Sequence, residues 1–268
     1  MFCTTLEPNH HKFIKKLGYI PVGLGVNFFT GDWFRDNSGQ NISKKNKNYA
    51  ECTYHYWFWK NYLDKHDDEW IGFCHYRKFW SLQQRNTEGI SFNRLEELVL
   101  KKIPEQYDEY ETILGEPFFV NQFRGMKFIK KGMKIFLKNP LLFFDKERRS
   151  LNFHFDLMHG EKNLSKAINL LDEKNQNDFR QFVNTEVSFN PWNMFICQSK
   201  EKLKNYYDVL FPWLAKCEKL FSSADLRGYG KIRIYAFLAE RFMSYWFQKN
   251  TKYTTMPVFF YDIRKDLD

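Results

Sequence analysis

Apolar runs that predict strands alternate along the chain with helical patterns. The run Trp70–Cys74 is apolar and bounded by polar residues, which is typical of a strand buried on both faces of a parallel sheet. Apolar residues at helical spacing predict helices at about residues 50–63, 161–172, 200–220 and 229–249. Strands that alternate with helices indicate an α/β fold, so we expect a mixed, mostly parallel sheet flanked by helices, with a helical C-terminal part. Further short strands are predicted at Thr112–Leu114, Trp192–Cys197 and Pro257–Tyr261.

Two of the predicted helices carry polar residues with a specific expected role. Asn48 is expected to cap the helix at 50–63, with Glu51 three residues later as in a capping box. Glu240 and Arg241 lie among many apolar residues of the helix at 229–249. Such a pair indicates either a semi-buried polar network or a binding site, and for a lone ionisable pair the network is the better hypothesis.

The composition is that of a globular chain without membrane spans. Of its 268 residues 43% are hydrophobic and 19% aromatic, which excludes disorder, and no repeat or linker divides the sequence. No apolar run approaches the roughly 18 residues that span a bilayer, and residues 1–16 lack the apolar region of a secretory signal. The five cysteines are scattered without a C-x-x-C pair, so neither a disulfide framework nor a zinc site is expected. These features predict a soluble protein in a reducing cytoplasm.

The net charge of +9 indicates an anionic partner. Nucleic acid, phospholipid headgroups and nucleotide-sugar diphosphates all fit this charge, and a Lys-rich surface can also serve solubility alone. No helix-turn-helix, zinc-finger or RNP signature is present, so nucleic acid is not an expected partner.

Four polar residues, His75 to Lys78, directly follow the predicted strand at 70–74. In an open α/β sheet such a loop faces the ligand crevice. Arg77 and Lys78 could neutralise a diphosphate, and His75 could hydrogen-bond a phosphate or protonate a leaving group. The alternative is a basic surface turn, since exposed Arg and Lys are common.

Upstream, the segment Asp36–Ser43 is dense in Asn, Ser and Gly, which suits either hydroxyl binding or an ordinary turn.

Several segments, taken in chain order, resemble the motifs of one enzyme family. They are Asp36–Ser43, Asn46, Glu51 and Tyr56–Asn61, followed by Trp70–Phe79, Asn193–Ile196 and Arg233–Arg241. The family is that of the bacterial capsular and exopolysaccharide glycosyltransferases, first described as a domain of unknown function. The sequence departs from the family pattern at Ala50 and Cys52 beside Glu51, at Lys78 in place of a second Arg, and at Ala236 in place of Gly. The family's opening strand has no clear counterpart, and Thr4–Lys12 is the candidate remnant.

The resemblance implies a GT-A-like fold and a single glycosyltransferase domain over residues 1–268. Its donor-binding half would cover about residues 1–120, and its acceptor-side, helical half about residues 121–268. Such an enzyme moves a sugar, galactofuranose being one candidate, from a nucleoside-diphosphate donor to a growing capsular or exopolysaccharide glycan. We expect a UDP-sugar as donor, a lipid-linked or polysaccharide acceptor, and a cytoplasmic protein peripheral to the inner-membrane surface.

The resemblance also implies roles for individual residues. We expect inverting transfer without a metal cofactor, because cations stand at His75 to Lys78 where many nucleotide-sugar transferases carry a D-x-D metal motif. Dependence on Mn²⁺ or Mg²⁺ is the alternative. The competing hypothesis is a non-catalytic basic protein that binds nucleic acid or serves as a scaffold for polysaccharide assembly.

The expected catalytic residues are the candidate bases Asp36, Glu51 and Glu240, with His75 and Arg77 at the leaving diphosphate. The expected donor contacts are Asn41, Ser43, Asn46, Tyr76, Lys78, Arg233 and Arg241. The expected acceptor contacts are Trp57, Trp59, His159 and Asn193.

Overall fold

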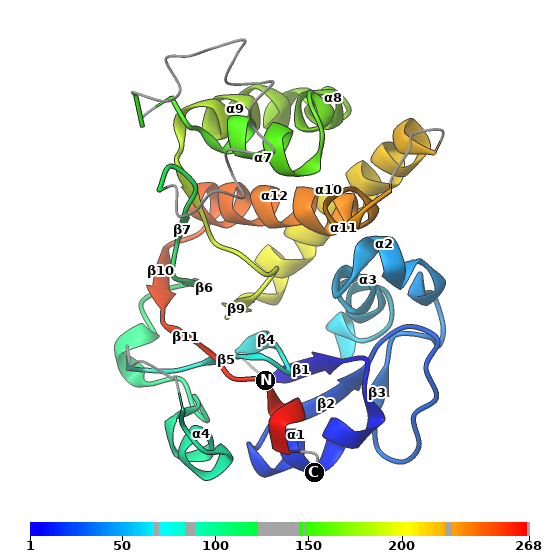
Figure 1. Ribbon diagram of the computed structural model, residues 1–268, viewed down its shortest axis with the longest axis vertical. Coiled ribbons are helices and arrows are strands. Elements are labelled where there is room, and N and C mark those ends of the chain that lie inside the picture. Colours follow the sequence, from blue (N-terminus) through cyan, green and yellow to red (C-terminus); the bar gives the residue numbers. More distant parts are fainter. Residues whose placement is uncertain (67–69, 84–88, 123–144, 147, 223–226, 267–268) are drawn as a thin grey trace.

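A mixed β-sheet built around the N-terminal strand organises the fold (Figure 1). The computed structural model describes residues 1–66, 70–83, 89–122, 145–146, 148–222 and 227–266. Strand β1 (Phe2–Thr5) lies between β2 (Ile20–Gly23) and β4 (Ile71–His75) and runs parallel to both. The strand order is β10-β6-β9-β4-β1-β2-β3, with β5 paired to β4 and β11 paired to β5. The other strands are β3 (Phe34–Arg35), β5 (Lys78–Trp80), β6 (Thr112–Gly115), β9 (Phe195–Cys197), β10 (Tyr253–Met256) and β11 (Val258–Phe260), with β7 (Phe118–Phe119) and β8 (Ser188–Phe189) forming a separate pair.

Helices flank the sheet, and the two longest helices of the described residues lie in the C-terminal half. These are α10 (Lys200–Phe221) and α12 (Ile234–Asn250), which pack against each other. The other helices are α1 (His11–Lys16), α2 (Asn46–Tyr49), α3 (Cys52–Asn61), α4 (Phe92–Leu98), α7 (Leu151–His159), α8 (Asn163–Ile168), α9 (Glu173–Thr185) and α11 (Tyr229–Ile232), with short 3₁₀ helices at Pro8–His10, Ser43–Lys45, Leu63–Lys65, Glu105–Tyr107 and Ile263–Asp266. In Figure 1, α7 to α9 occupy the end of the molecule opposite α1. The expected mixed sheet flanked by helices is confirmed. Within the described ranges, no helix has the length and apolar character needed to cross a membrane.

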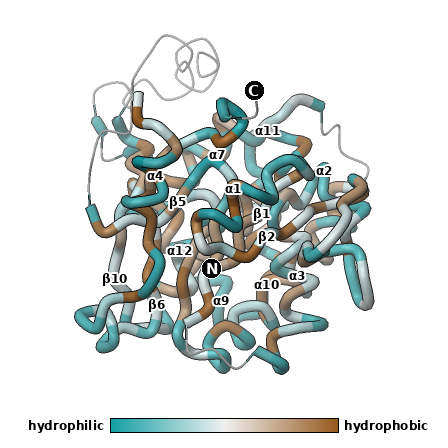
Figure 2. Tube along the Cα trace, turned by 90° about the horizontal axis from the view of Figure 1, so that it is seen from below, coloured by the Kyte–Doolittle hydropathy of each residue, from teal (hydrophilic) through white to brown (hydrophobic). Residues whose placement is uncertain are grey.

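Apolar clusters cover both faces of the sheet, because side chains alternate along each strand. Phe2 of β1 and Phe73 of β4 belong to the cluster shared with α3, α10 and α12. Cys3 and Cys74, one position further along the same strands, belong to the cluster shared with α4. Figure 2 shows hydrophilic positions along the outer loops and hydrophobic stretches in the elements between them. All five cysteines are buried with free thiols.

A strand near the N-terminus, which the hydrophobic pattern did not predict, lies inside the sheet between β2 and β4. It lies at Phe2–Thr5, slightly before the candidate remnant at Thr4–Lys12, and all four of its residues are buried. A four-residue strand that ends in two threonines has no distinct apolar run, which is why the hydrophobic pattern did not reveal it.

A left-handed residue shortens the helix that was predicted to begin at Ala50. The φ angle of Ala50 is 48°, so this residue separates α2 from α3, and α3 begins at Cys52. The expected Asn48 cap is wrong, because the Asn48 side chain donates instead to the carbonyl oxygen of Ile232 at 2.8 Å. Asn48 therefore links α2 to α11 rather than capping the start of a helix.

The boundaries of three further predictions also change. The strand predicted at Trp192–Cys197 begins only at Phe195, because the two residues at 192 and 193 have left-handed φ angles. The helix predicted at 229–249 is divided at Arg233 into α11 and α12. The helix predicted at 161–172 is the shorter α8, and the polar helix α9 after it was missed because it presents few apolar positions.

Asp36 ties the loop after β2 to α3. One carboxylate oxygen accepts the Gly25 amide N–H at 2.9 Å, and the other accepts the Thr53 hydroxyl at 2.5 Å. The side chain is fully buried, and burial raises the pKa of Asp36 to about 6 although both hydrogen bonds oppose that shift. This carboxylate therefore braces the loop beside the ends of the central strands.

Replacing Asp36 by Asn should change how stability depends on pH. A carboxyl group whose pKa is raised in the folded state stabilises the fold below its ordinary pKa of 3.8, and this contribution is lost as the pH rises through about 6. The stability advantage of the wild type over Asp36→Asn should therefore shrink by about 2 kcal/mol between about pH 4 and pH 7. Urea unfolding at both pH values measures this change. A difference that is the same at both pH values would contradict the raised pKa.

Candidate active site

A cavity of about 160 Å³ opens at the carboxyl ends of the central strands. Thr4 and Thr5 line it from the end of β1, and His75 lines it from the end of β4. In open α/β sheets this edge is where ligands bind. The charged residues that line the cavity are Glu51, Arg77, Lys78, Arg233 and Glu240.

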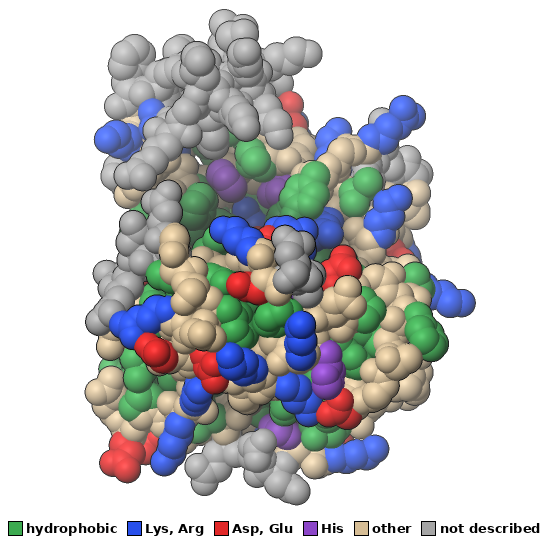
Figure 3. All heavy atoms as spheres, turned by 60° about the horizontal axis from the view of Figure 1, so that its bottom comes forward, with side chains coloured by type: hydrophobic (Ala, Val, Ile, Leu, Met, Phe, Trp, Pro, Cys, Tyr) green, Lys and Arg blue, Asp and Glu red, His purple; other side chains and the backbone are tan. Residues whose placement is uncertain are grey.

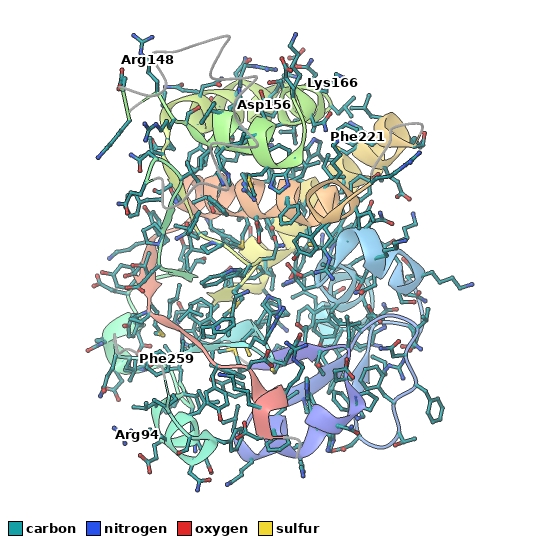
Figure 4. The ribbon with its side chains drawn as sticks, in the orientation of Figure 1. Arg94, Arg148, Asp156, Lys166, Phe221 and Phe259 are labelled. Carbon is teal, nitrogen blue, oxygen red and sulfur yellow. The ribbon has the colours of Figure 1, made fainter. Side chains whose placement is uncertain are left out.

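A larger cavity of about 730 Å³ adjoins the first. The two share lining residues from β5, α11, α12 and the loop before β9, namely Lys78, Trp192, Tyr229, Phe237 and Glu240. Helix α7 contributes His159 and Asp156, and Asp156 is labelled in Figure 4. Figure 3 shows Lys and Arg side chains gathered around a recess in which histidines are visible. We refer to these two adjoining spaces as the small cavity and the large cavity.

His75 is held by protein atoms at both ring nitrogens. Its Nε2 lies 2.7 Å from the carbonyl oxygen of Trp192, which can only accept, so Nε2 carries the hydrogen. Nδ1 then accepts the Thr4 hydroxyl at 2.8 Å. Burial lowers the pKa of His75, which keeps the ring neutral. With both nitrogens engaged, the geometry favours a positioning role for His75 over the expected proton transfer to a leaving group.

Glu240 lies where the two cavities meet. Its Oε1 accepts the Trp192 amide N–H at 2.9 Å, and its Oε2 accepts a guanidinium hydrogen of Arg241 at 2.8 Å. Burial raises the pKa of Glu240 to about 7, although the charge of Arg241 acts in the opposite direction. Arg241 is itself buried, and its guanidinium lies 3.9 Å from the ring centroid of Phe189. The pair is thus a buried ion pair that also forms part of a cavity wall.

Glu51 faces the small cavity from the residue just before α3. Its Oε1 accepts the side-chain amide of Asn193 at 2.6 Å, and the same amide group donates to the carbonyl oxygen of Ala236 at 3.2 Å. Glu51 has no capping hydrogen bond to the helix backbone. It anchors the loop before β9, so the expected capping-box role is wrong.

The cations of the small cavity lie against aromatic rings. His75 and Lys78 pair across the turn between β4 and β5, which leaves Tyr76 and Arg77 at its tip. The Lys78 ammonium lies 4.6 Å from the ring centroid of Trp192, and the Arg77 guanidinium lies 5.0 Å from that of Tyr76. Burial lowers the pKa of Lys78, against the attraction of Glu51 and Glu240. The cavity therefore combines cations that can bind a diphosphate with carboxylates that can accept a proton.

Besides Asn193, which contacts Glu51, five of the expected site residues line neither cavity. Asn41 and Ser43 are engaged with each other, since the Asn41 side-chain oxygen accepts the Ser43 hydroxyl at 3.0 Å in a local turn. The indole N–H groups of the two tryptophans donate to Ser38 and Asp208, so both rings serve packing. The five residues are Asp36, Asn41, Ser43, Trp57 and Trp59.

The remaining expected residues lie in or beside the cavities. Asn46, Glu51, His75, Tyr76, Arg77, Lys78, Arg233 and Glu240 line the small cavity, His159 and Arg241 line the large one, and Asn193 contacts Glu51. Sequence reasoning missed Thr4, Thr5, Trp192, Tyr229 and Phe237. The threonines could have been found only by recognising β1. Trp192 directly precedes the family-like motif at 193–196, but nothing in the sequence marks its left-handed backbone.

Among the residues that the structure describes, no three His, Cys, Asp or Glu side chains lie together as a protein-only metal site would require. The carboxylates of the small cavity are Glu51 and Glu240, and both accept hydrogen bonds from protein groups.

Comparison with known proteins places these features in a family. None of the curated proteins matches the chain. Among solved structures, the chain is similar to the apo structure of the bifunctional glycosyltransferase WbbM, with 16% sequence identity and a TM-score of 0.65 over 97% of this chain. The chain spans 44% of the length of that structure, and the likeness shows a shared fold. The family model described as "Domain of unknown function (DUF4422)" matches residues 7–251. This chain therefore belongs to the DUF4422 family.

Proposed function

We propose that this protein is a glycosyltransferase that moves a sugar from a nucleoside-diphosphate donor to a hydroxyl group of a glycan. The observation that carries the proposal is the small cavity, which holds Arg77, Lys78 and Arg233 beside the carboxylates Glu51 and Glu240. Sugar transfer needs cations at the diphosphate and a base at the acceptor hydroxyl. The likeness in fold to a bifunctional glycosyltransferase supports the same reaction class.

In the proposed mechanism Glu240 is the base and the reaction inverts the anomeric configuration. Glu240 lines both cavities, and its pKa of about 7 suits a group that takes up a proton near neutral pH. The acceptor oxygen attacks the anomeric carbon while its proton passes to Glu240, and the bond from that carbon to the diphosphate oxygen breaks. The electron pair leaves with the diphosphate, whose charge Arg77 and Lys78 stabilise without a metal.

The donor in this proposal is a UDP-sugar, a galactofuranose donor included, and the acceptor is a lipid-linked or polysaccharide glycan of a capsule or exopolysaccharide. The side chains of Val26 and Phe28, 76% and 82% exposed, follow the cavity residue Leu24. Lys44 and Lys47 are exposed on the neighbouring segment. Apolar and cationic side chains together suit an anionic membrane surface, which supports action at the cytoplasmic face of the inner membrane.

A nucleotide screen tests the proposed function. Thermal unfolding is measured with UDP, GDP, CMP, ADP and dTDP, each with EDTA and with Mn²⁺. UDP should raise the Tm most, because a ligand that binds only the folded state stabilises it, and the rise should persist in EDTA. A rise that requires Mn²⁺ would replace the metal-free mechanism. No response to any nucleotide, together with steeply salt-dependent binding of oligonucleotides, would favour the non-catalytic basic binding protein.

Arg77→Ala should lower kcat by about 10²–10³-fold with little change in Tm, because it removes a cation from the leaving diphosphate. Transfer from the UDP-sugar that the screen supports gives the rate. Arg264→Ala is the matched control, since the Arg264 guanidinium also lies over Tyr76, at 5.7 Å, but does not line the small cavity. Equal rates in Arg77→Ala and Arg264→Ala would assign Arg77 to a surface turn.

Glu240→Gln should lower kcat by about 10²–10⁴-fold, because the amide cannot take up the acceptor proton. Glu51→Gln should lose less, since its amide oxygen can still accept the Asn193 hydrogen bond. In the wild type, kcat/KM should rise with pH through about 7 as Glu240 loses its proton. A larger loss in Glu51→Gln, with this pH dependence retained in Glu240→Gln, would identify Glu51 as the base.

A further inference from the structure

Trp192 has a backbone conformation that bulky residues rarely adopt. Its φ angle is 75°, and that of Asn193 is 50°. Left-handed positions favour glycine, and a residue with a large side chain stays in one only where its surroundings hold it there. Trp192 lies between the small and large cavities, so the strain is located at the proposed active site.

Three residues of the small cavity hold this strained turn. Glu240 accepts the Trp192 amide N–H at 2.9 Å, and His75 donates to the Trp192 carbonyl oxygen at 2.7 Å. Glu51 accepts the side-chain amide of Asn193 at 2.6 Å. The position of the indole is therefore determined by the same side chains that surround the proposed reaction centre.

The indole lines both cavities, and the Lys78 ammonium lies 4.6 Å from its ring centroid. The lining of the large cavity includes the rings of Phe118, Phe189, Tyr229 and Phe237, together with Asp156 and His159. Aromatic rings offer apolar faces to the C–H groups of a sugar ring, and a carboxylate and a histidine offer hydrogen-bond partners to its hydroxyls. This combination fits a saccharide.

We propose that the indole of Trp192 is the wall between a donor subsite in the small cavity and a subsite for the acceptor saccharide in the large cavity. The inference rests on the proposed function. The wall directs the acceptor hydroxyl to Glu240 and keeps water away from the anomeric carbon of the donor. Without the wall, a water oxygen bonds to that carbon, its proton passes to Glu240, and the bond to the diphosphate breaks. The products are then free sugar and UDP, so the transferase becomes a donor hydrolase.

The experiment compares the full chain with Trp192→Gly, Trp192→Ala and Trp192→Phe. Calorimetry measures the binding of UDP, and a coupled assay measures UDP release from UDP-glucose, UDP-galactose and UDP-galactofuranose without acceptor. We expect the Gly and Ala variants to release UDP about tenfold faster than the wild type while still binding it, with the Phe variant between them. Trp59→Phe is the control for an altered indole outside both cavities.

Comparing Trp192→Gly with Trp192→Ala separates the effect of backbone strain from the effect of losing the indole. Both remove the wall, but only Gly adopts a φ of 75° without strain, so Trp192→Gly should melt about 2–4 °C above Trp192→Ala. If UDP binds and both variants release UDP from the UDP-sugars at the wild-type rate, the proposed role of Trp192 as a wall is contradicted. The proposed donor site is not affected by that result. If the wild type does not bind UDP, the UDP-sugar donor is overturned, and if it binds none of the five nucleotides, the proposed function itself is overturned.

Discussion

Hydrogen bonds to Trp192 and Asn193 join parts of the chain that are far apart in sequence. Strand β9 runs antiparallel to β4, so the residues that precede β9 lie at the edge of the sheet where β4 ends. At that edge they meet His75 from β4, Glu51 from the start of α3 and Glu240 from α12. The antiparallel course of β9 thus brings the loop that contacts helix α12 to the carboxyl ends of the central strands. Both cavities depend on this meeting.

Burial sets the charge state of the groups gathered there. It raises the pKa of Glu240 and lowers that of Lys78, while each group opposes the shift of the other through its charge. The two shifts move the pKa values of Glu240 and Lys78 toward each other. His75, neutral and bonded at both nitrogens, adds no charge. The charge of a bound diphosphate would therefore change the electrostatic balance of the site more than the charge of any single residue that lines it.

The sequence predicted the strands at 70–74 and 112–114 and the long helix at 200–220, because each has a clear hydrophobic period. It also predicted eight of the residues that line the small cavity, among them His75 and Arg77, and all eight lie in the family-like motifs. It misplaced Asn41, Ser43, Trp57 and Trp59, because polar turns and indole N–H groups serve local packing as readily as ligands. It missed Trp192, because a left-handed backbone in a bulky residue is imposed by distant partners and leaves no local signature.

The last strands of the sheet have a consequence for how the protein folds. β10 pairs with β6, and β11 pairs with β5, although both partners lie far earlier in the chain. Until residues 253–260 are in place, β6 has an unpaired edge. Open strand edges pair readily with other chains, and contacts between distant segments form slowly. We therefore expect the edge of β6 to stay open during synthesis until the last strands form, which follows from the connectivity of the sheet and not from the residues of the active site.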